Sequence, residues 1–277
     1  MGILNITPDS FAEVVPLVGP DATAVGPDVD RAVARALEME AAGADMIDVG
    51  GESTRPGAAP VGAREEARRV LPVIEALTGR LRIPVSVDTY KGVVARDALS
   101  AGAVIVNDVS GLQYDPDLAG VAAAQGAALI VMHTRGRSAS MYAEADYGNL
   151  VAEIAAELRE SIALAVRAGM PADGVIVDPG IGFAKRQAHS YGVLARLPEL
   201  AALVGRPLLT GPSRKSFMRD ALDGRPPRER DWGTAAAVTA AVLGGSHVIR
   251  VHAVAEMVQV VRVAEQIRRH AEEPAGR

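Results

Sequence analysis

Short apolar runs alternate with helix-like stretches along almost the whole chain. Each run is rich in β-branched residues, ends in a polar or glycine-containing turn, and is followed by a segment with helical periodicity. Strands that are apolar throughout are buried on both faces, as in a parallel sheet. The pattern occurs eight times, in the runs 2–6, 45–50, 84–88, 104–108, 128–133, 175–180, 207–211 and 247–252.

The segments 28–43 and 149–169 show clear helix periodicity, and both end in glycine. One face of the first helix is expected to carry Val29, Val33, Ala36 and Leu37. Eight alternating strand–helix units are typical of a (β/α)8 TIM barrel. An open doubly wound sheet has the same local pattern, but no GxGxxG follows the first run here, and eight units exceed its usual number of about six.

We therefore predict a single-domain α/β protein, with a (β/α)8 barrel over residues 1–271 and a disordered tail at 272–277. Long loops are expected at 12–27, 134–147 and 223–231. In a barrel, the loops that follow the strands usually carry the functional residues. The chain opens directly on a strand-like run, so we expect its natural start to lie slightly upstream.

Composition narrows the functional classes. A net charge of -5 and an aromatic content of 3% argue against a general binder of nucleic acid or anionic membranes. No apolar run approaches the ~18 residues of a membrane span, and no signal peptide is recognisable, so we expect a cytoplasmic protein. The absence of cysteine excludes disulfides, thiolate metal sites and a cysteine nucleophile.

A barrel of this kind has its active site at the carboxyl ends of the strands, so polar residues there are candidates. The candidates are Asn5, Asp48, Glu52, Thr54, Arg55, Asp88, Asn107, Asp108, His133, Asp178, Lys215, Ser216, Arg250 and His252. One alternative is a self-satisfied polar network that only closes the barrel. His133 is ambiguous, and we assign it no role as a ligand.

Two chemical groups can be distinguished among these residues. The acceptors and donors suited to the edge of a flat heterocycle are Asp88, Asn107, Asp178 and Lys215. Arg250 and His252 are one residue apart on a strand and share a face, so with Asn5 they could clamp a phosphate or its magnesium. The alternative for this pair is an ion pair with a neighbouring carboxylate. A dinuclear zinc hydrolase is disfavoured, because it would need HxH after the first strand.

The stretch GPSRKSF (211–217) places two cations and two hydroxyls where a strand is expected to give way to a helix. Lys215 and Ser216 would lie near the N-terminus of that helix, which favours an anion. Arg214 would be the solvated or structural member of the basic pair. The alternative is a solvated basic turn.

Seven motifs occur in order and together resemble dihydropteroate synthase, the folate-pathway family that sulfonamides inhibit. They are NITPDSF (5–11), DVGGESTRPG (48–57), SVDT (86–89), NDVSG (107–111), DPGIGFAK (178–185), GPSRKSF (211–217) and RVHA (250–253). The resemblance implies a (β/α)8 barrel, typically a homodimer, that uses Mg²⁺. It also implies condensation of 6-hydroxymethyl-7,8-dihydropterin diphosphate with 4-aminobenzoate, with release of diphosphate.

The resemblance also assigns the site residues. It implies that the pterin is bound by Asp88, Asn107, Asp178 and Lys215. It implies that the diphosphate is bound by Asn5, Arg250 and His252, with Asn5 at the metal. It implies that 4-aminobenzoate is bound by Phe11, Thr54, Arg55, Pro56, Phe183, Lys215 and Ser216. The residues expected to take part in catalysis are Asp88, Lys215, Arg250 and His252.

Three departures from the family pattern are visible. The loop after Phe11 is longer and more apolar than usual, with Glu13 in place of the usual Asp. Ala253 stands where an Asp commonly follows the histidine, and the segment 134–149 matches only loosely. Two alternatives remain: a pterin-binding methyltransferase domain, which would lack the STRPG and SRKSF elements, and a catalytically silent pterin-binding paralogue, which would have lost site residues.

Overall fold

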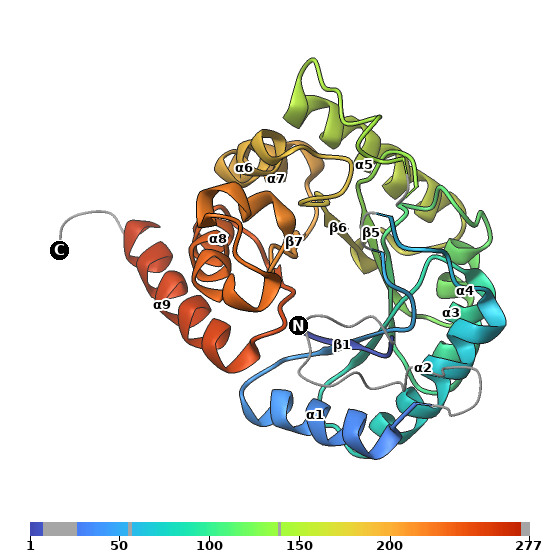
Figure 1. Cartoon of the computed structure of the whole chain (residues 1–277). Helices are drawn as coiled ribbons and strands as arrows, with labels where there is room; N and C mark the ends of the chain where they lie inside the picture. The colour runs from blue at the N-terminus through green and yellow to red at the C-terminus, as the bar shows by residue number, and fades with distance from the viewer. Residues whose placement is uncertain (8–26, 55–56, 138–139, 273–277) are drawn as a thin grey trace.

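Eight short parallel strands form the inner ring of the protein. The computed structural model describes residues 1–7, 27–54, 57–137 and 140–272 (Figure 1). The strands in this part of the chain are β1 (Gly2–Asn5), β2 (Ile47–Gly50), β3 (Val85–Asp88), β4 (Ile105–Asp108), β5 (Ala128–Met132), β6 (Val175–Asp178), β7 (Leu209–Thr210) and β8 (Val248–Ile249). Each of them lies within one of the eight predicted runs.

The ring of strands is closed. Strands β1 to β6 pair in chain order as one parallel sheet, and β7 pairs with β8. Two further parallel bridges, Val177 with Leu208 and Gly2 with Val251, join β6 to β7 and β8 to β1. The Ile3 N–H donates to the Val251 carbonyl at 3.0 Å across the second junction. Closure confirms the predicted barrel and excludes the open sheet.

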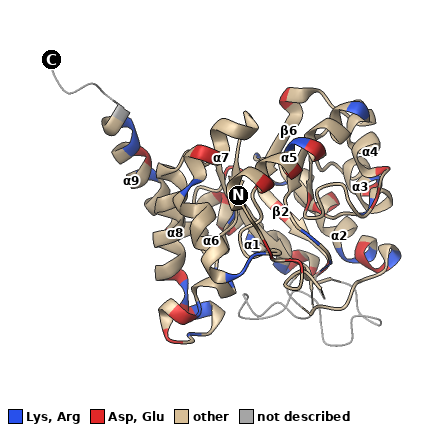
Figure 2. Cartoon of the chain, turned by 90° about the horizontal axis from the view of Figure 1, so that it is seen from above, with Lys and Arg blue, Asp and Glu red and all other residues tan. Residues whose placement is uncertain are grey.

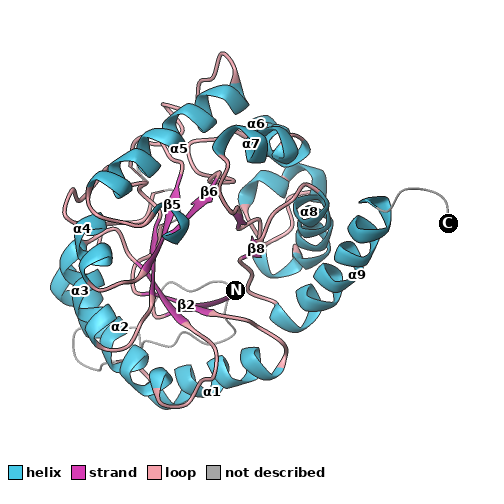
Figure 3. Cartoon of the chain, turned by 180° about the vertical axis from the view of Figure 1, so that it is seen from behind, coloured by secondary structure: helices cyan, strands magenta, loops and turns pink. Residues whose placement is uncertain are grey.

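An outer ring of helices covers the strands (Figure 3). The α-helices in the described residues are α1 (Val29–Ala41), α2 (Ala63–Thr78), α3 (Gly92–Ser100), α4 (Leu118–Ala124), α5 (Leu150–Arg167), α6 (Gln187–Ala195), α7 (Leu197–Val204), α8 (Asp231–Leu243) and α9 (Val254–Glu272). Both predicted helices are present, as α1 and α5. The assignment of Leu37 to the buried face of α1 is wrong: Leu37 is 37% exposed, because it lies about 100° around the helix from buried Ala36.

The predictions for the segment after GPSRKSF, for the C-terminal tail and for the loop 12–27 differ from the structure or lie largely outside the described residues. No α-helix follows GPSRKSF directly; Ser216–Met218 is a single 3-10 turn, and α8 begins only at Asp231. Gly224 and two prolines in the intervening segment prevent a longer helix there. The predicted tail is helical at Glu272, the last residue of α9, and 273–277 lie outside the described residues. Most of the predicted loop 12–27 also lies outside them.

The strands place polar side chains above an apolar layer. Side chains alternate along a strand, so Ile105 shares a face with Asn107, and Ile130 shares a face with Met132. Ile105 and Ile130 pack with Met1 and Leu209 in a small buried cluster. Asn107 and Met132, the residues two positions further along β4 and β5, line a pocket. The barrel therefore has an apolar floor and a polar mouth. Within the described residues, no helix is long and apolar enough to cross a membrane.

Candidate functional site

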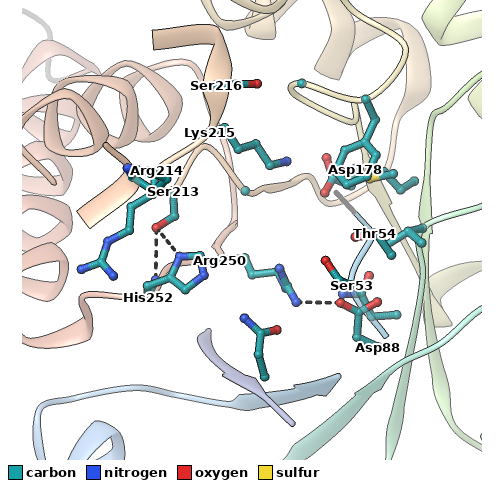
Figure 4. A pocket seen from close by; sticks show the side chains of 18 of the residues that line it. Ser53, Thr54, Asp88, Asp178, Ser213, Arg214, Lys215, Ser216, Arg250 and His252 are labelled. Atoms are coloured by element: carbon teal, nitrogen blue, oxygen red, sulfur yellow. Dashed lines mark hydrogen bonds and ion pairs between the residues drawn. The ribbon is translucent and has the colours of Figure 1, made fainter. Parts of the chain in front are cut away.

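A pocket of about 570 Å³ opens at the carboxyl ends of the strands. All the described residues that the family resemblance assigns to the site line it, namely Asn5, Thr54, Asp88, Asn107, Asp178, Phe183, Lys215, Ser216, Arg250 and His252 (Figure 4). The other three predicted residues, Phe11, Arg55 and Pro56, lie outside the described residues. The predicted residues that line the pocket come from seven of the strand ends, and Met132 at the end of β5 adds the eighth.

Asp178 ends β6 and is held by the turn that follows it. Its Oδ1 accepts a hydrogen bond of 2.7 Å from the Gly180 N–H. Gly180 has φ +69°, and a Cβ there would lie 1.9 Å from the His133 carbonyl oxygen, so only glycine fits. Burial raises the pKa of Asp178, while Lys215 and the Gly180 N–H oppose that shift. The carboxylate is therefore buried, oriented and dependent on nearby cations for its charge.

Lys215 reaches across the pocket toward Asp178 (Figure 4). Its Nζ donates to the Ile181 carbonyl at 2.5 Å and lies 4.5 Å from the centre of the Phe183 ring. Burial lowers the pKa of Lys215 to about 8, and Asp178 opposes this shift. A single ammonium thus faces both an acid and an aromatic ring, a geometry that suits a cation–π contact.

Arg250 follows β8 and bridges two carboxylates. Its Nε donates to Asp48 Oδ2 at 2.6 Å, and its Nη2 donates to Asp88 Oδ2 at 2.7 Å. Asn107 Nδ2 also donates to Asp48 Oδ2, at 2.9 Å. Burial raises the pKa of Asp88 to about 7, and Arg250 opposes this shift. Arg250 therefore forms the ion pair with neighbouring carboxylates that was the alternative to a phosphate-binding role. It also lines the pocket.

Ser213 holds the ring of His252. Its Oγ lies 2.9 Å from His252 Nδ1 and accepts a hydrogen bond of 3.2 Å from the His252 backbone N–H (Figure 4). Because Ala253 supplies no carboxylate, this hydroxyl orients the imidazole in the present chain. Sequence reasoning missed Ser213 as a site residue, although the residue lies inside the quoted GPSRKSF motif.

Arg214 belongs to the scaffold, as predicted for one member of the basic pair. Its Nε and Nη2 each donate to an Asp231 carboxylate oxygen at 2.7 Å, a bidentate pair that anchors the start of α8. Its backbone N–H donates to Thr234 Oγ1 at 3.0 Å. The segment before Ser216 is thereby fastened to α8.

Three candidate strand-end residues lie outside the pocket lining, at Asp48, Asp108 and His133. Asp48 is fully buried against Arg250. Asp108 binds the turn after β4, where it accepts hydrogen bonds from the Ser110 and Leu112 N–H groups at 2.8 and 2.6 Å.

Several lining residues were not predicted. Val109, Met132 and Met141 supply an apolar wall. An apolar residue carries no chemical signal in a single sequence, so its position in the pocket becomes visible only when the chain is folded. Together with the charged residues, this wall suits a flat, partly apolar ligand with polar edges.

Comparison with known proteins identifies the family. Residues 1–252 match the family model described as "Pterin binding enzyme". A dihydropteroate synthase of Synechocystis is 44% identical over 96% of this chain and 89% of its own length.

The chain belongs to the dihydropteroate synthase family.

Solved members of the family share the whole fold. The Yersinia pestis synthase, solved with a sulfonamide drug complex, has a TM-score of 0.88 and 40% identity over 97% of this chain and 94% of its own. The Xanthomonas albilineans synthase, solved with 4-aminobenzoic acid, has a TM-score of 0.86 and 38% identity over 99% of this chain and 93% of its own. These relatives favour the transferase over the methyltransferase and silent-paralogue alternatives. The described residues contain no cluster of three or more His, Cys, Asp or Glu side chains that could hold a metal ion.

Ser213→Ala tests the role of the Ser213 hydroxyl in orienting His252. The change removes both hydrogen bonds of this hydroxyl to His252, and loss of the one to the imidazole, worth about 1.4 kcal/mol, should lower kcat about ten-fold, because the ring is no longer fixed. Steady-state kinetics should show this loss mainly in kcat rather than in KM for 4-aminobenzoate. Ser246→Ala is the matched control, since it removes a buried hydroxyl that bonds Thr210 outside the pocket lining. Equal effects of the two variants would contradict the assignment.

Proposed function

We propose that the chain condenses 6-hydroxymethyl-7,8-dihydropterin diphosphate with 4-aminobenzoate, giving 7,8-dihydropteroate and diphosphate, with the residue roles that follow. The supporting observation is the arrangement of Asp178, Lys215 and Phe183 in one pocket. It places a carboxylate for a heterocycle edge next to an ammonium and an aromatic ring. The relative solved with 4-aminobenzoic acid adds support for the second substrate.

The pterin is held by its polar edge. The Asp178 carboxylate accepts N–H bonds from the ring amide and the exocyclic amine, using the lone pairs that the Gly180 N–H leaves available. Asp88 and Asn107, on neighbouring strands, supply further acceptor and donor groups. Lys215 donates to a ring acceptor. These buried charge-assisted bonds fix the register of the ring.

Reaction begins with cleavage of the methylene C–O bond, whose electron pair leaves with the diphosphate. The electron-rich dihydropterin stabilises the cationic methylene, and the negative charges of Asp88 and Asp178 lie beside the ring. Arg250 and His252 donate to the departing diphosphate. The amine nitrogen of 4-aminobenzoate then attacks the methylene, and the proton of the new C–N ammonium passes to water. An arylamine is neutral at pH 7, so no strong general base is needed, and positioning supplies much of the rate.

4-Aminobenzoate lies beside Phe183 and Lys215, with Thr54 at the pocket wall. Ser216 is exposed at the rim, where its hydroxyl donates to the substrate carboxylate. The 3-10 turn at 216–218 is too short for a helix dipole to contribute, so Ser216 and Lys215 carry this interaction. Phe11, Arg55 and Pro56 remain assigned to this side by the family resemblance alone.

The residues present fit Mg²⁺ at the diphosphate. Asn5 lines the pocket, and its Oδ1 lies 3.7 Å from the point where a Cβ on Gly50 would lie. Glycine there leaves room between Asn5 and Asp88, whose Cβ is 3.4 Å from the same point. Mg²⁺ keeps several waters and takes few protein ligands besides substrate phosphates, so Asn5 would supply one of its oxygen ligands. When bound, Mg²⁺ neutralises charge on the diphosphate.

The proposal extends to the organisation of the protein. Residues 1–271 form one pterin-binding domain, which is supported by the packing of α9 against α8. A homodimer is supported by exposed apolar side chains at Leu243, Val263 and Ile267 on these helices. Helix α8 has a single charged residue, Asp231, so it is drawn almost entirely in tan in Figure 2, where only charged residues are blue or red. A cytoplasmic location remains a prediction from the sequence.

Asp178→Asn tests the pterin assignment. The change replaces one acceptor oxygen with a donor inside a buried site, which costs about 2–4 kcal/mol, or about 30- to 1000-fold in affinity. Calorimetry with 6-hydroxymethylpterin measures this loss without the diphosphate. Glu160→Gln, a similar change on the outer helix α5, should bind normally. Normal pterin binding by Asp178→Asn would show that the assignment is wrong.

Ser216→Ala tests the 4-aminobenzoate assignment. Loss of one hydrogen bond to a charged group, worth about 1.5–3 kcal/mol, should raise the KM for 4-aminobenzoate about ten-fold or more. The affinity for pterin should not change. Wild-type enzyme should use 4-aminobenzamide poorly, and that substrate should lose much less on mutation. The assignment fails if the KM values of both substrates change alike, or if neither changes.

A further inference from the structure

Lys185 is the largest fully buried side chain in the described residues, with 1% of its surface exposed. It ends the motif DPGIGFAK, from which the proposed function uses only Asp178 and Phe183. Lys185 does not line the pocket. A buried ammonium is costly unless it is paired and hydrogen-bonded, so its partners indicate what it does.

The contacts of Lys185 point in two directions. Its Nζ donates to His133 Nδ1 at 2.7 Å and to the Phe183 carbonyl at 3.1 Å. An ammonium has no acceptor, so Nδ1 must be the acceptor and His133 carries its proton on Nε2. The Nε2–H then donates to Glu157 Oε2 at 3.1 Å. Burial, followed by the charge of Lys185, lowers the pKa of His133 to about 4, which agrees with a neutral ring.

This chain of bonds is anchored at its outer end. Arg135 Nε donates to both Glu157 oxygens, at 3.0 and 3.2 Å, and its Nη2 donates to Glu153 at 2.9 Å. Glu153 and Glu157 lie on α5. The ammonium of Lys185 is therefore held in place by the outer ring of helices, through His133, on the side away from the pocket.

On its other side, the ammonium lies beside the turn that holds Asp178. A Cβ on Gly180 would lie 3.3 Å from Lys185 Nζ, and the Gly180 N–H is the donor to Asp178 Oδ1. Lys215 approaches Asp178 from within the pocket (Figure 4). Lys215 and Lys185 thus both favour the charged form of Asp178, Lys215 from within the pocket and Lys185 from outside its lining.

We propose that Lys185 is a positioning residue that, from behind the pocket, keeps Asp178 ionised for the pterin and fixes Phe183 beside the second substrate. The functional part of this inference rests on the proposed function. The ammonium does not touch either substrate. It acts on the pterin side through its charge and on the 4-aminobenzoate side through the Phe183 carbonyl.

The surrounding charges set the sign of the effect. Burial raises the pKa of Asp178, and the opposing influences are Lys215, the Gly180 N–H, Lys185 and Arg250. Burial lowers the pKa of Lys185 to about 7; Asp178 and Glu157 raise it, while Lys215 and Arg135 lower it further. Removing the Lys185 charge must therefore raise the pKa of Asp178. Pterin binding needs the ionised carboxylate. When the pH is lowered, binding by the variant should therefore be lost at a higher pH than binding by the wild type.

The test measures the ionisation of Asp178 directly. Protein labelled with ¹³C at aspartate Cγ is titrated by NMR, and the Asp178 signal is assigned by its loss in Asp178→Asn. In Lys185→Met the titration midpoint should rise by about one pH unit or more, since loss of a nearby opposite charge has that magnitude. Calorimetry with 6-hydroxymethylpterin should show the acid limit of binding moving by the same amount.

Two further variants separate charge from structure. Lys185→Gln keeps a donor for His133 without the charge and should show the same rise, which keeps the test valid if the methionine variant does not fold. Ser190→Ala removes the hydroxyl that accepts from the Gly182 N–H at 3.2 Å, which loosens the same loop without removing a charge. Its Asp178 midpoint should not move.

The possible failures are distinguishable. An unchanged Asp178 midpoint in Lys185→Gln overturns the role of Lys185, whatever the pterin affinity does. A raised midpoint with normal pterin binding by Asp178→Asn leaves the electrostatic role of Lys185 intact and overturns the proposed pterin contact instead. Equal midpoint rises in Lys185→Gln and Ser190→Ala would indicate a structural role and contradict the inference.

Discussion

The pairing of buried charges is the constraint on which this site depends. A carboxylate or an ammonium taken out of water is unstable unless an opposite charge and hydrogen bonds replace the lost solvation. At the barrel mouth, Asp48 and Asp88 share Arg250, while Lys215 and Lys185 favour the charged form of Asp178. These groups come from five strands, β2, β3, β6, β7 and β8, or from the loops that follow them. Closing the barrel therefore also assembles the charges, and the charges stabilise the closed mouth only as a set.

The same constraint explains how one cavity serves two substrates and a leaving group. Burial leaves Asp88 with a pKa of about 7 and Lys215 with a pKa of about 8, so both depend on their partners for the charged form. Apart from Arg250, these charges are already in place before a charged intermediate forms, which is electrostatic preorganisation. Arg250 is paired with carboxylates in this structure, so a departing diphosphate would compete with Asp48 and Asp88 for its guanidinium. The apolar floor beneath keeps these interactions away from bulk water.

Much of this arrangement could be predicted from the sequence. Apolar β-branched runs separated by helical periodicity determine a parallel barrel, and a parallel barrel brings its strand ends together; Asn107 and Asp178 follow from that geometry alone. What a single sequence does not contain is the partner of each charge. Nothing in the spacing of Asp48 and Arg250, which are about 200 residues apart, predicts their 2.6 Å contact, and Ser213 gives no sign that it faces His252. The prediction of an α-helix after GPSRKSF was wrong because it rested on the motif alone. The residues that break the helix, Gly224 and the prolines that follow, lie further along the chain.

The proposed reaction forms one C–N bond to 4-aminobenzoate for each diphosphate that leaves. The most direct measurement mixes the enzyme and Mg²⁺ with 6-hydroxymethyl-7,8-dihydropterin diphosphate, with and without 4-aminobenzoate, and follows diphosphate and 7,8-dihydropteroate together. The account predicts one dihydropteroate for each diphosphate released, and little sustained release when 4-aminobenzoate is omitted. Equal rates of diphosphate release with and without 4-aminobenzoate, and no dihydropteroate, would contradict it.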